Sequence, residues 1–165
     1  MRFRTILADP PWAYHQNGTR PLPYDCMTDH EILSLPVSRL AAQDAHLWLW
    51  TTNATIGLGL HVMSTWGFTY RSCLTWIKPR FGMGMYLRHQ TEHLLLGTRG
   101  RAPIQFRGQG TSLYAPVQDH SHKPEEQYAV IERCSPGPYL ELFARRPQLG
   151  WHCWSNEVDS DVEVA

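Results

Sequence analysis

Four consecutive residues near the start of the chain, Asp9-Pro10-Pro11-Trp12, combine the groups needed to hold a planar amine. They follow an apolar, β-rich segment over residues 3–8, which predicts a stiff pocket at the end of a strand. Asp9 can accept one N–H of an amine and the Pro10 carbonyl the other, and both prolines restrict the backbone beforehand. Trp12 offers a face on which an unstacked base can lie. The alternative is a strand that ends in a Pro-Pro turn beside a buried tryptophan.

The exocyclic amine of a nucleobase is a weak nucleophile because its lone pair is delocalised into the ring. A catalyst must therefore favour the pyramidal nitrogen that exists only during attack, and fixed acceptors at Asp9 and Pro10 would do so. Other chemistries have less support. Asp9 is not one of an obvious pair of acids, no serine or cysteine occupies a nucleophile elbow, and the Gly-x-Gly fragments lack the surroundings of a nucleotide-binding fingerprint.

The charge of the chain is unevenly distributed, although its formal net charge is zero. Between residues 71 and 107 there is one acid, Glu92, and the basic residues are Arg71, Lys78, Arg80, Arg88, Arg99, Arg101 and Arg107. Aromatic residues are interleaved with these cations, a combination that favours phosphate contacts plus base stacking. We therefore expect Lys78, Arg80 and Arg88 to bind a nucleic-acid substrate. The alternative is a solvated basic face with ordinary core aromatics.

Length and composition restrict the class of protein to which the chain can belong. With 165 residues, 42% of them hydrophobic and 18% charged, the chain predicts one globular domain with a substantial core. No apolar window approaches the length of a bilayer span or a secretory core, so we expect a cytoplasmic protein with no membrane partner. Four cysteines without a CxxC pair indicate reduced thiols. His89 and His93 fall in a strand-like segment, so no metal site is predicted.

The pocket needs elements that position it, and the chain predicts alternating strands and helices. We expect strands at residues 3–8, 46–50, 68–77, 92–97, 112–117, 139–144 and 151–154. We expect helices at residues 55–66, from Pro124 to about Arg133, and from a capping box at Thr28-Asp29-His30-Glu31 to about Leu35. Long loops lie at residues 13–27 and 78–85. This alternation predicts a mostly parallel sheet covered by helices, with ligands at the carboxyl ends of the strands, where Asp9 and Arg145 fall.

Together, several segments resemble the MT-A70 family of S-adenosylmethionine-dependent adenine N6-methyltransferases, over nearly the whole chain. They are Ala8-Asp9-Pro10-Pro11-Trp12, residues 22–28, 47–51, 75–78 and 92–97, Ser121-His122-Lys123-Pro124, residues 131–137, and Glu141-Leu142-Phe143-Ala144-Arg145. The resemblance implies an α/β fold, a Rossmann-like class I methyltransferase sheet with helices on both faces and a permuted motif order. In that order the catalytic motif precedes the cofactor strand. We expect a methyltransferase domain at 1–155 and an acidic C-terminal tail at 156–165.

The resemblance also assigns roles to residues. Asp9, Pro10, Pro11 and Trp12 match the catalytic motif, in which the acid and the first proline carbonyl hold the target amine and the ring packs on adenine. Tyr24 matches a residue of the loop that closes over the target base. The positions matching cofactor contacts are Asp9, His122, Lys123, Phe143, Arg145, Asn156 and Glu157. Among them, Lys123 would reach the carboxylate of S-adenosyl-L-methionine.

The chain departs from the family pattern in two places. Better-known members carry an acid upstream of the catalytic strand that helps hold the cofactor adenine, whereas eight residues precede Asp9 here. Glu157 stands where an amide is common, which leaves an acceptor-only side chain at neutral pH. The residues that hold the cofactor adenine are therefore not predicted.

The implied activity is methyl transfer from S-adenosyl-L-methionine to the N6 amine of adenine in nucleic acid, by in-line attack without a covalent enzyme intermediate. The chain shows none of the extensions of the messenger-RNA enzymes, which favours a bacterial or phage-type protein, a DNA substrate over RNA, and the cytoplasm of a bacterium or infected host. Three alternatives stay open: a cytosine-N4 methyltransferase, a small-molecule amino-methyltransferase, and a non-catalytic nucleic-acid-binding partner. The intact Asp9-Pro10-Pro11-Trp12 motif speaks against the last. The sequence leaves open a homodimer, the recognition sequence and the strandedness of the substrate.

Overall fold

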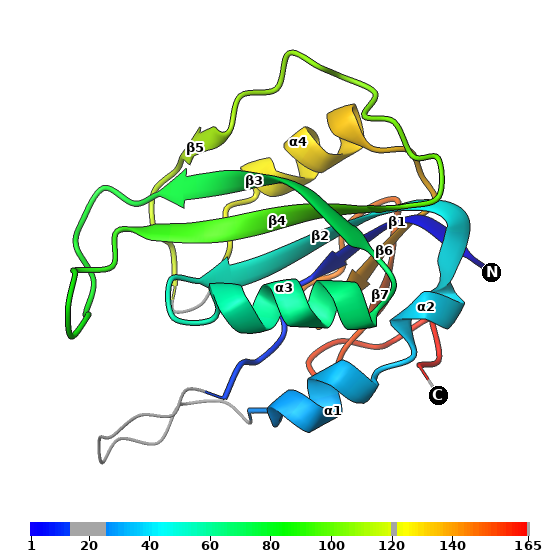
Figure 1. Cartoon of the computed structure of the whole chain (residues 1–165), viewed down its shortest axis with the longest axis horizontal. Helices are drawn as coiled ribbons and strands as arrows, with labels where there is room; N and C mark the ends of the chain where they lie inside the picture. Colours follow the sequence, from blue (N-terminus) through cyan, green and yellow to red (C-terminus); the bar gives the residue numbers. More distant parts are fainter. Residues whose placement is uncertain (14–25, 120–121, 165) are drawn as a thin grey trace.

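Strand β1 (Phe3–Ala8) lies inside a seven-stranded sheet whose order is β5-β3-β4-β2-β1-β6-β7 (Figure 1). The structure is a computed structural model that describes residues 1–13, 26–119 and 122–164. The remaining strands are β2 (Ala41–Thr52), β3 (Thr69–Ile77), β4 (Thr91–Arg99), β5 (Ser112–Tyr114), β6 (Tyr139–Leu142) and β7 (Trp151–Trp154). The helices are α1 (Asp29–Ser34), α2 (Val37–Leu40), α3 (Ile56–Thr65) and α4 (Glu126–Cys134).

Strand β4 runs against all the other strands of the sheet. β1 pairs in parallel with β2 and β6, β6 with β7, and β3 with β5, whereas β4 pairs antiparallel with both β2 and β3. The mostly parallel sheet predicted from the sequence is confirmed. Because β4 is reversed, its first residues lie at the edge where the parallel strands end, which is the usual place for ligands in such sheets.

Helices cover both faces of the sheet, as the Rossmann-like interpretation requires (Figure 1). On one face, α3 packs against β2 and its following residue Trp66 joins Leu47 in a buried cluster. On the other face, Ile131 of α4 shares a second cluster with Trp48. Leu47 and Trp48 enter different clusters because successive side chains of a strand point to opposite faces. Within the described residues, none of the helices has the length and apolar character needed to cross a bilayer.

Most predicted elements are present, but several boundaries differ from the sequence prediction and one short helix was not predicted. β2 begins at Ala41 instead of His46, directly after α2, which the sequence did not indicate. Its first half contains exposed polar residues that hide the apolar pattern. β6 ends at Leu142 because Phe143 adopts φ 65, a left-handed conformation that is rare for a residue with a side chain and ends the extended backbone.

The acidic residues at the end of the chain fold back onto β7. Asp161 accepts hydrogen bonds from the backbone N–H of Cys153 (2.7 Å) and pairs with His152 Nδ1 (2.7 Å). Val162 and Val164 are partly buried against the α3-side core. Residues 156–164, expected to be an acidic tail, are therefore in contact with the domain.

Candidate active site

The carboxyl edge of the sheet brings together charged residues from four segments of the chain. Asp9 follows β1, Glu92 is the second residue of β4, and Arg145 follows β6. Lys123 lies just before α4. Glu92 reaches this edge only because β4 is antiparallel, since the second residue of a parallel strand would lie at the opposite edge.

Lys123 connects two carboxylates at this edge. Its Nζ atom lies 3.0 Å from Asp9 Oδ2 and 3.2 Å from Glu92 Oε2. Lys78 Nζ lies 2.7 Å from Glu92 Oε1, which completes a line of alternating charge: Lys78, Glu92, Lys123 and Asp9. We call these four residues the charge cluster. All four side chains are largely buried, so each charge is stabilised chiefly by its neighbours.

The pKa values in the charge cluster follow from burial and pairing. Burial raises the pKa of Asp9, and the nearby Lys123 ammonium offsets part of this rise. Burial alone would lower the pKa of Lys123, but the two carboxylates outweigh it and raise this pKa. Burial would raise the pKa of Glu92, but Lys123 and Lys78 hold it below the usual range. Lys123 and Glu92 therefore stay ionised at neutral pH, whereas the surroundings of Asp9 make protonation of its carboxylate easier than in water.

The two prolines after Asp9 hold the chain in a tight turn against β2. The Pro10 carbonyl accepts the backbone N–H of Trp12 (2.8 Å), and the Pro11 carbonyl accepts the N–H of Met27 (3.0 Å). A carbonyl has two lone pairs, so Pro10 keeps a second site for an amine N–H. The Trp12 ring is 4% exposed and its Nε1–H donates to the Trp50 carbonyl (3.1 Å), so in this structure its main contacts are with the core. That the target base packs on Trp12 stays a prediction.

Two cavities meet at the charge cluster. The larger has a volume of about 540 Å³ and lies between the ends of β1 and β6 and the start of α4. The smaller has a volume of about 110 Å³ and is lined by the whole Asp-Pro-Pro-Trp motif. The residues that line both are Asp9, Trp50, Lys123 and Arg145. A group bound in one cavity would therefore be separated from a group in the other only by these side chains.

Glu141 is a site residue that sequence reasoning missed as a ligand contact. It lies in β6 on the α4 face, lines the larger cavity, is 8% exposed, and accepts a hydrogen bond from the Tyr128 hydroxyl (2.9 Å). Burial raises its pKa to about 7, the Tyr128 hydrogen bond lowers it, and Asp9 adds to the rise. A charged residue inside the otherwise apolar strand Tyr139–Leu142 was the signal that could have revealed it.

The structure gathers most, though not all, of the cofactor contacts predicted from the sequence. His122, Phe143, Arg145 and Glu157 line the larger cavity with Asp9 and Lys123. His122 is held by Glu125 Oε1 (2.8 Å) and Arg146 Nη2 (3.2 Å). Asn156 is exposed and is not among the residues that line this cavity.

The residues predicted to contact nucleic acid are separated into different environments. Arg80 and Arg88 are exposed in the segment between β3 and β4, residues 78–90, which we call the β3–β4 loop. Lys78 is partly buried and bound to Glu92 within the charge cluster, and its contact with nucleic acid stays a prediction. Tyr24 lies outside the described residues.

The aromatic residues of the basic stretch do not form one surface. Phe81 and Tyr86 are exposed in the β3–β4 loop beside Arg80 and Arg88. Trp76, in contrast, is 2% exposed and donates to the Ala115 carbonyl, so it belongs to the core. The combination of cations and aromatics predicted over residues 71–107 is therefore realised at the β3–β4 loop.

The fold is a permuted Rossmann-like α/β sheet of the class I methyltransferase type. In it, the Asp-Pro-Pro-Trp motif at the end of β1 precedes the cavity wall that β6 builds. The MT-A70 family model matches residues 3–157. The chain belongs to the MT-A70 family.

Comparison with characterised proteins finds relatives of two kinds. The chain is 36% identical over 170 residues to the N(6)-adenosine-methyltransferase subunit METTL3 of Danio rerio, and 36% identical over 174 residues to the catalytic subunit METTL3 of Homo sapiens. Each match covers 96% of this chain and 28% of the relative, so the chain spans just over a quarter of their length. It is also 27% identical over 192 residues to the type II methyltransferase M.MunI of a Mycoplasma species, a match that covers 99% of this chain and 81% of that protein.

Proposed function

We propose that this protein transfers a methyl group from S-adenosylmethionine to the N6 amine of adenine in nucleic acid. The observation that carries the proposal is the meeting of two cavities at Asp9 and Lys123, one large enough for a nucleoside cofactor and one formed by the amine-binding motif. The relatives named as N(6)-adenosine methyltransferases support the same chemistry.

The lining of the larger cavity fits a cofactor that carries both signs of charge. S-adenosylmethionine has a carboxylate, an ammonium, a sulfonium and ribose hydroxyls, and when bound it supplies an electrophilic methyl group. Lys123 and Arg145 offer cationic partners for the carboxylate, while Asp9, Glu141 and Glu157 offer acceptors for the ammonium and hydroxyl groups. The cavity volume of about 540 Å³ falls within the usual range for ligand sites.

The smaller cavity fits an amine that must donate two N–H groups. Asp9 and the remaining lone pair of Pro10 are the acceptors predicted from the sequence. Glu92 lines the same cavity and offers a third acceptor, because the buried Oε2 atom that pairs with Lys123 Nζ (3.2 Å) has a further lone pair. Fixed acceptors favour the pyramidal nitrogen during attack, and Asp9 can take up the proton that the nitrogen loses.

Asp9→Asn tests this assignment with little change in shape. We expect transfer of labelled methyl from S-adenosylmethionine to fall on the order of 100-fold or more, because an amide neither takes up the proton that the nitrogen loses nor pairs with Lys123 as a carboxylate does. Binding of S-adenosylhomocysteine, measured by calorimetry, should weaken much less. Asp29→Asn, at a partly exposed position of α1 away from the site, is the matched control. Unchanged turnover in Asp9→Asn would overturn the proposal.

We take DNA as the polymer, since the relative of comparable length is a bacterial type II methyltransferase. Matched DNA and RNA oligonucleotides, each single-stranded and double-stranded, should be incubated with labelled cofactor and digested to nucleosides. N6-methyladenine in the DNA arm supports the proposal. Labelled methyl found in RNA but not in DNA would show that the substrate is RNA. Labelled methyl found on cytosine would contradict the adenine assignment.

A further inference from the structure

A third cavity, of about 600 Å³, lies away from the active site. It is on the α4 face of β2, β3 and β4, beneath the segment between β4 and β5, residues 100–111, which we call the β4–β5 arch (Figure 1). Within the described residues it shares no lining residue with the two cavities at the charge cluster. His46 and its β4 partner Thr98 belong to its wall, which places it toward the edge opposite Asp9.

The cavity exists because no helix or strand is formed in the β4–β5 arch, so the sheet below it is roofed by irregular chain. The roof is fixed to α4 at two points. The Gln105 N–H donates to the Cys134 carbonyl (2.8 Å), and Arg133 donates to Gln109 Oε1 (2.6 Å) while its guanidinium lies 5.2 Å from the centre of the Phe106 ring. The space is therefore already formed in the protein and does not require opening.

The polar side chains that β2 contributes to the wall, Trp48 and His46, are already paired. Trp48 Nε1–H donates to Ser135 Oγ (2.9 Å), Ser135 lies 2.6 Å from His46 Nδ1, and His46 Nε2 lies 2.8 Å from the Ala102 carbonyl. Each donor in this chain of hydrogen bonds has an acceptor if His46 Nε2 carries the proton and the Ser135 hydroxyl donates to His46 Nδ1. The rest of the wall includes Leu74, Leu96, Ile104 and Phe106. Apart from the hydroxyls of Ser72 and Thr111, which also belong to the lining, this wall suits the apolar part of a ligand.

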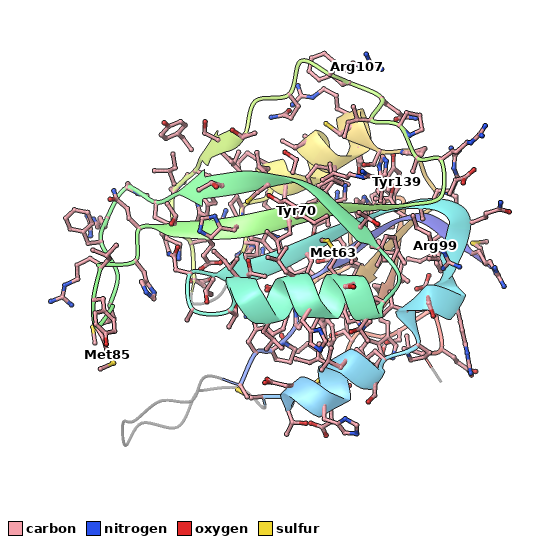
Figure 2. All side chains as sticks on the ribbon, in the orientation of Figure 1. Met63, Tyr70, Met85, Arg99, Arg107 and Tyr139 are labelled. Carbon is pink, nitrogen blue, oxygen red and sulfur yellow. The ribbon has the colours of Figure 1, made fainter. Side chains whose placement is uncertain are left out.

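The part of the cavity lining that faces solvent, its rim, carries positively charged side chains. Arg71, Arg101 and Arg107 belong to the lining, and none of the residues that line the cavity is acidic. All three arginines are exposed, and Arg107 lies at the top of the molecule over the arch (Figure 2). Asp44 is the carboxylate beside this rim, and its Oδ1 atom accepts the backbone N–H of Arg101 (2.7 Å). An apolar space beneath three guanidinium groups complements a molecule with an apolar body and an anionic head.

We propose that this cavity is a binding site for a small amphipathic anion, whose acyl or aryl body fills the space under the β4–β5 arch and whose carboxylate or phosphate meets Arg71, Arg101 and Arg107. The site is independent of the methyl-transfer site. It holds whether or not the proposed methyltransferase activity is found.

The test uses decanoate as the acyl probe and 8-anilinonaphthalene-1-sulfonate as the aryl probe, with decanol as the uncharged comparison. We expect saturable binding of one anion per chain, with decanoate displacing the dye. Arg101→Ala/Arg107→Ala should weaken decanoate binding at least about tenfold and leave decanol binding unchanged, because only the head group loses its partners. Arg2→Ala/Arg39→Ala changes the net charge equally at exposed positions outside the cavity and should have no effect.

A second variant removes the space itself. Leu96→Trp places a larger ring into the cavity and should abolish binding of both decanoate and decanol, with unfolding curves confirming that the variant is folded. Should Leu96→Trp not fold, a structure of the wild-type protein with decanoate decides the location. Dye that is displaced by DNA but not by decanoate, or binding that neither cavity variant changes, would overturn the proposal.

Discussion

Glu141 shows how a single buried carboxyl can make the stability of this domain depend on pH. Its pKa is near 4.5 in an unfolded chain and is raised to about 7 in the fold, chiefly by burial. Between these values the folded state binds more protons than the unfolded state, so stability falls as the pH rises. Above about pH 7 the folded state carries the full cost of ionising Glu141, roughly 3 kcal/mol.

Glu141→Gln should remove this dependence, because an amide is neutral at every pH and still accepts from Tyr128. We expect the free energy of unfolding at pH 8 to rise by about 2 kcal/mol, with little change at pH 5. Urea unfolding at both pH values measures this difference. Glu126→Gln, at an exposed position on α4, is the control. The same gain at pH 5 and pH 8 would contradict the assignment.

Glu92 tests the electrostatics of the charge cluster, since its charge adds to the rise in the pKa of Asp9. Glu92→Gln removes that charge, leaves Lys123 paired with Asp9, and should lower the pKa of Asp9. We expect kcat to fall about tenfold because the carboxylate becomes a weaker proton acceptor, and the acid limb of the pH–rate profile to move to lower pH. A lower kcat with an unmoved profile would assign Glu92 a purely structural role.

At the scale of single residues, the sequence predicted those whose identity is unusual in itself. The motif Asp9-Pro10-Pro11-Trp12 can be recognised without any knowledge of the fold. Lys123 was assigned a role because it lies in a motif of the family. Glu92 and Glu141 were not assigned, because each matters through a property that the local sequence does not contain. Glu92 depends on the reversal of β4, and Glu141 on the burial of one face of β6 under α4.

At the scale of elements, α3 contains two glycines in very different surroundings. A Cβ added at Gly59 would overlap Thr51 Cγ2 and lie 3.4 Å from Leu95 Cδ1, whereas at Gly57 it would meet nothing within 4 Å. Gly59 therefore lets α3 approach β2 and β4 closely, and Gly57 has no such constraint.

These two positions form a matched pair for measurement. Gly59→Ala should lower the free energy of unfolding by about 1–3 kcal/mol through overpacking. Gly57→Ala should raise it by about 0.5 kcal/mol through better helix propensity. Equal effects of the two substitutions in urea unfolding would show that α3 is not packed as closely as described.

The elements themselves were predicted to the extent that their apolar patterns are regular. The capping box at Thr28 is confirmed, with reciprocal bonds between the Thr28 and Glu31 side chains and the backbone. The direction of β4 was not predicted. The apolar pattern of a strand indicates which face is buried, but it does not indicate whether the strand runs parallel or antiparallel to its neighbours. α2 was missed because Val37–Leu40 is a single turn directly before a strand.

At the scale of the whole molecule, the cations of residues 71–107 separate to opposite sides. The β3–β4 loop with Arg80 and Arg88 extends from the catalytic edge, where Met85 marks its far end, while Arg99 lies on the opposite side (Figure 2). Only the first group is placed to contact a nucleic acid whose base enters the smaller cavity.

The salt dependence of DNA binding distinguishes the two groups. Arg80→Ala/Arg88→Ala should weaken binding and lower the slope of log K against log salt by about 2, because two phosphate contacts are lost. Arg99→Ala/Arg101→Ala removes the same charge at the opposite edge and should leave the slope unchanged. Fluorescence anisotropy at several salt concentrations measures both, and equal slopes for the two variants would assign DNA binding to net charge alone.

The two ends of the β3–β4 loop are bonded to each other and to β4. The Lys78 backbone N–H donates to the Gln90 carbonyl (2.8 Å), and Gln90 Nε2 donates back to the Lys78 carbonyl (3.0 Å). Lys78 Nζ forms an ion pair with Glu92. The segment between these contacts joins the sheet through two fixed ends, so we expect changes in its length or composition to leave Asp9, Glu92 and Lys123 in place. Under the proposed function, exchanging this segment would alter the choice of polymer and leave the methyl-transfer site unchanged.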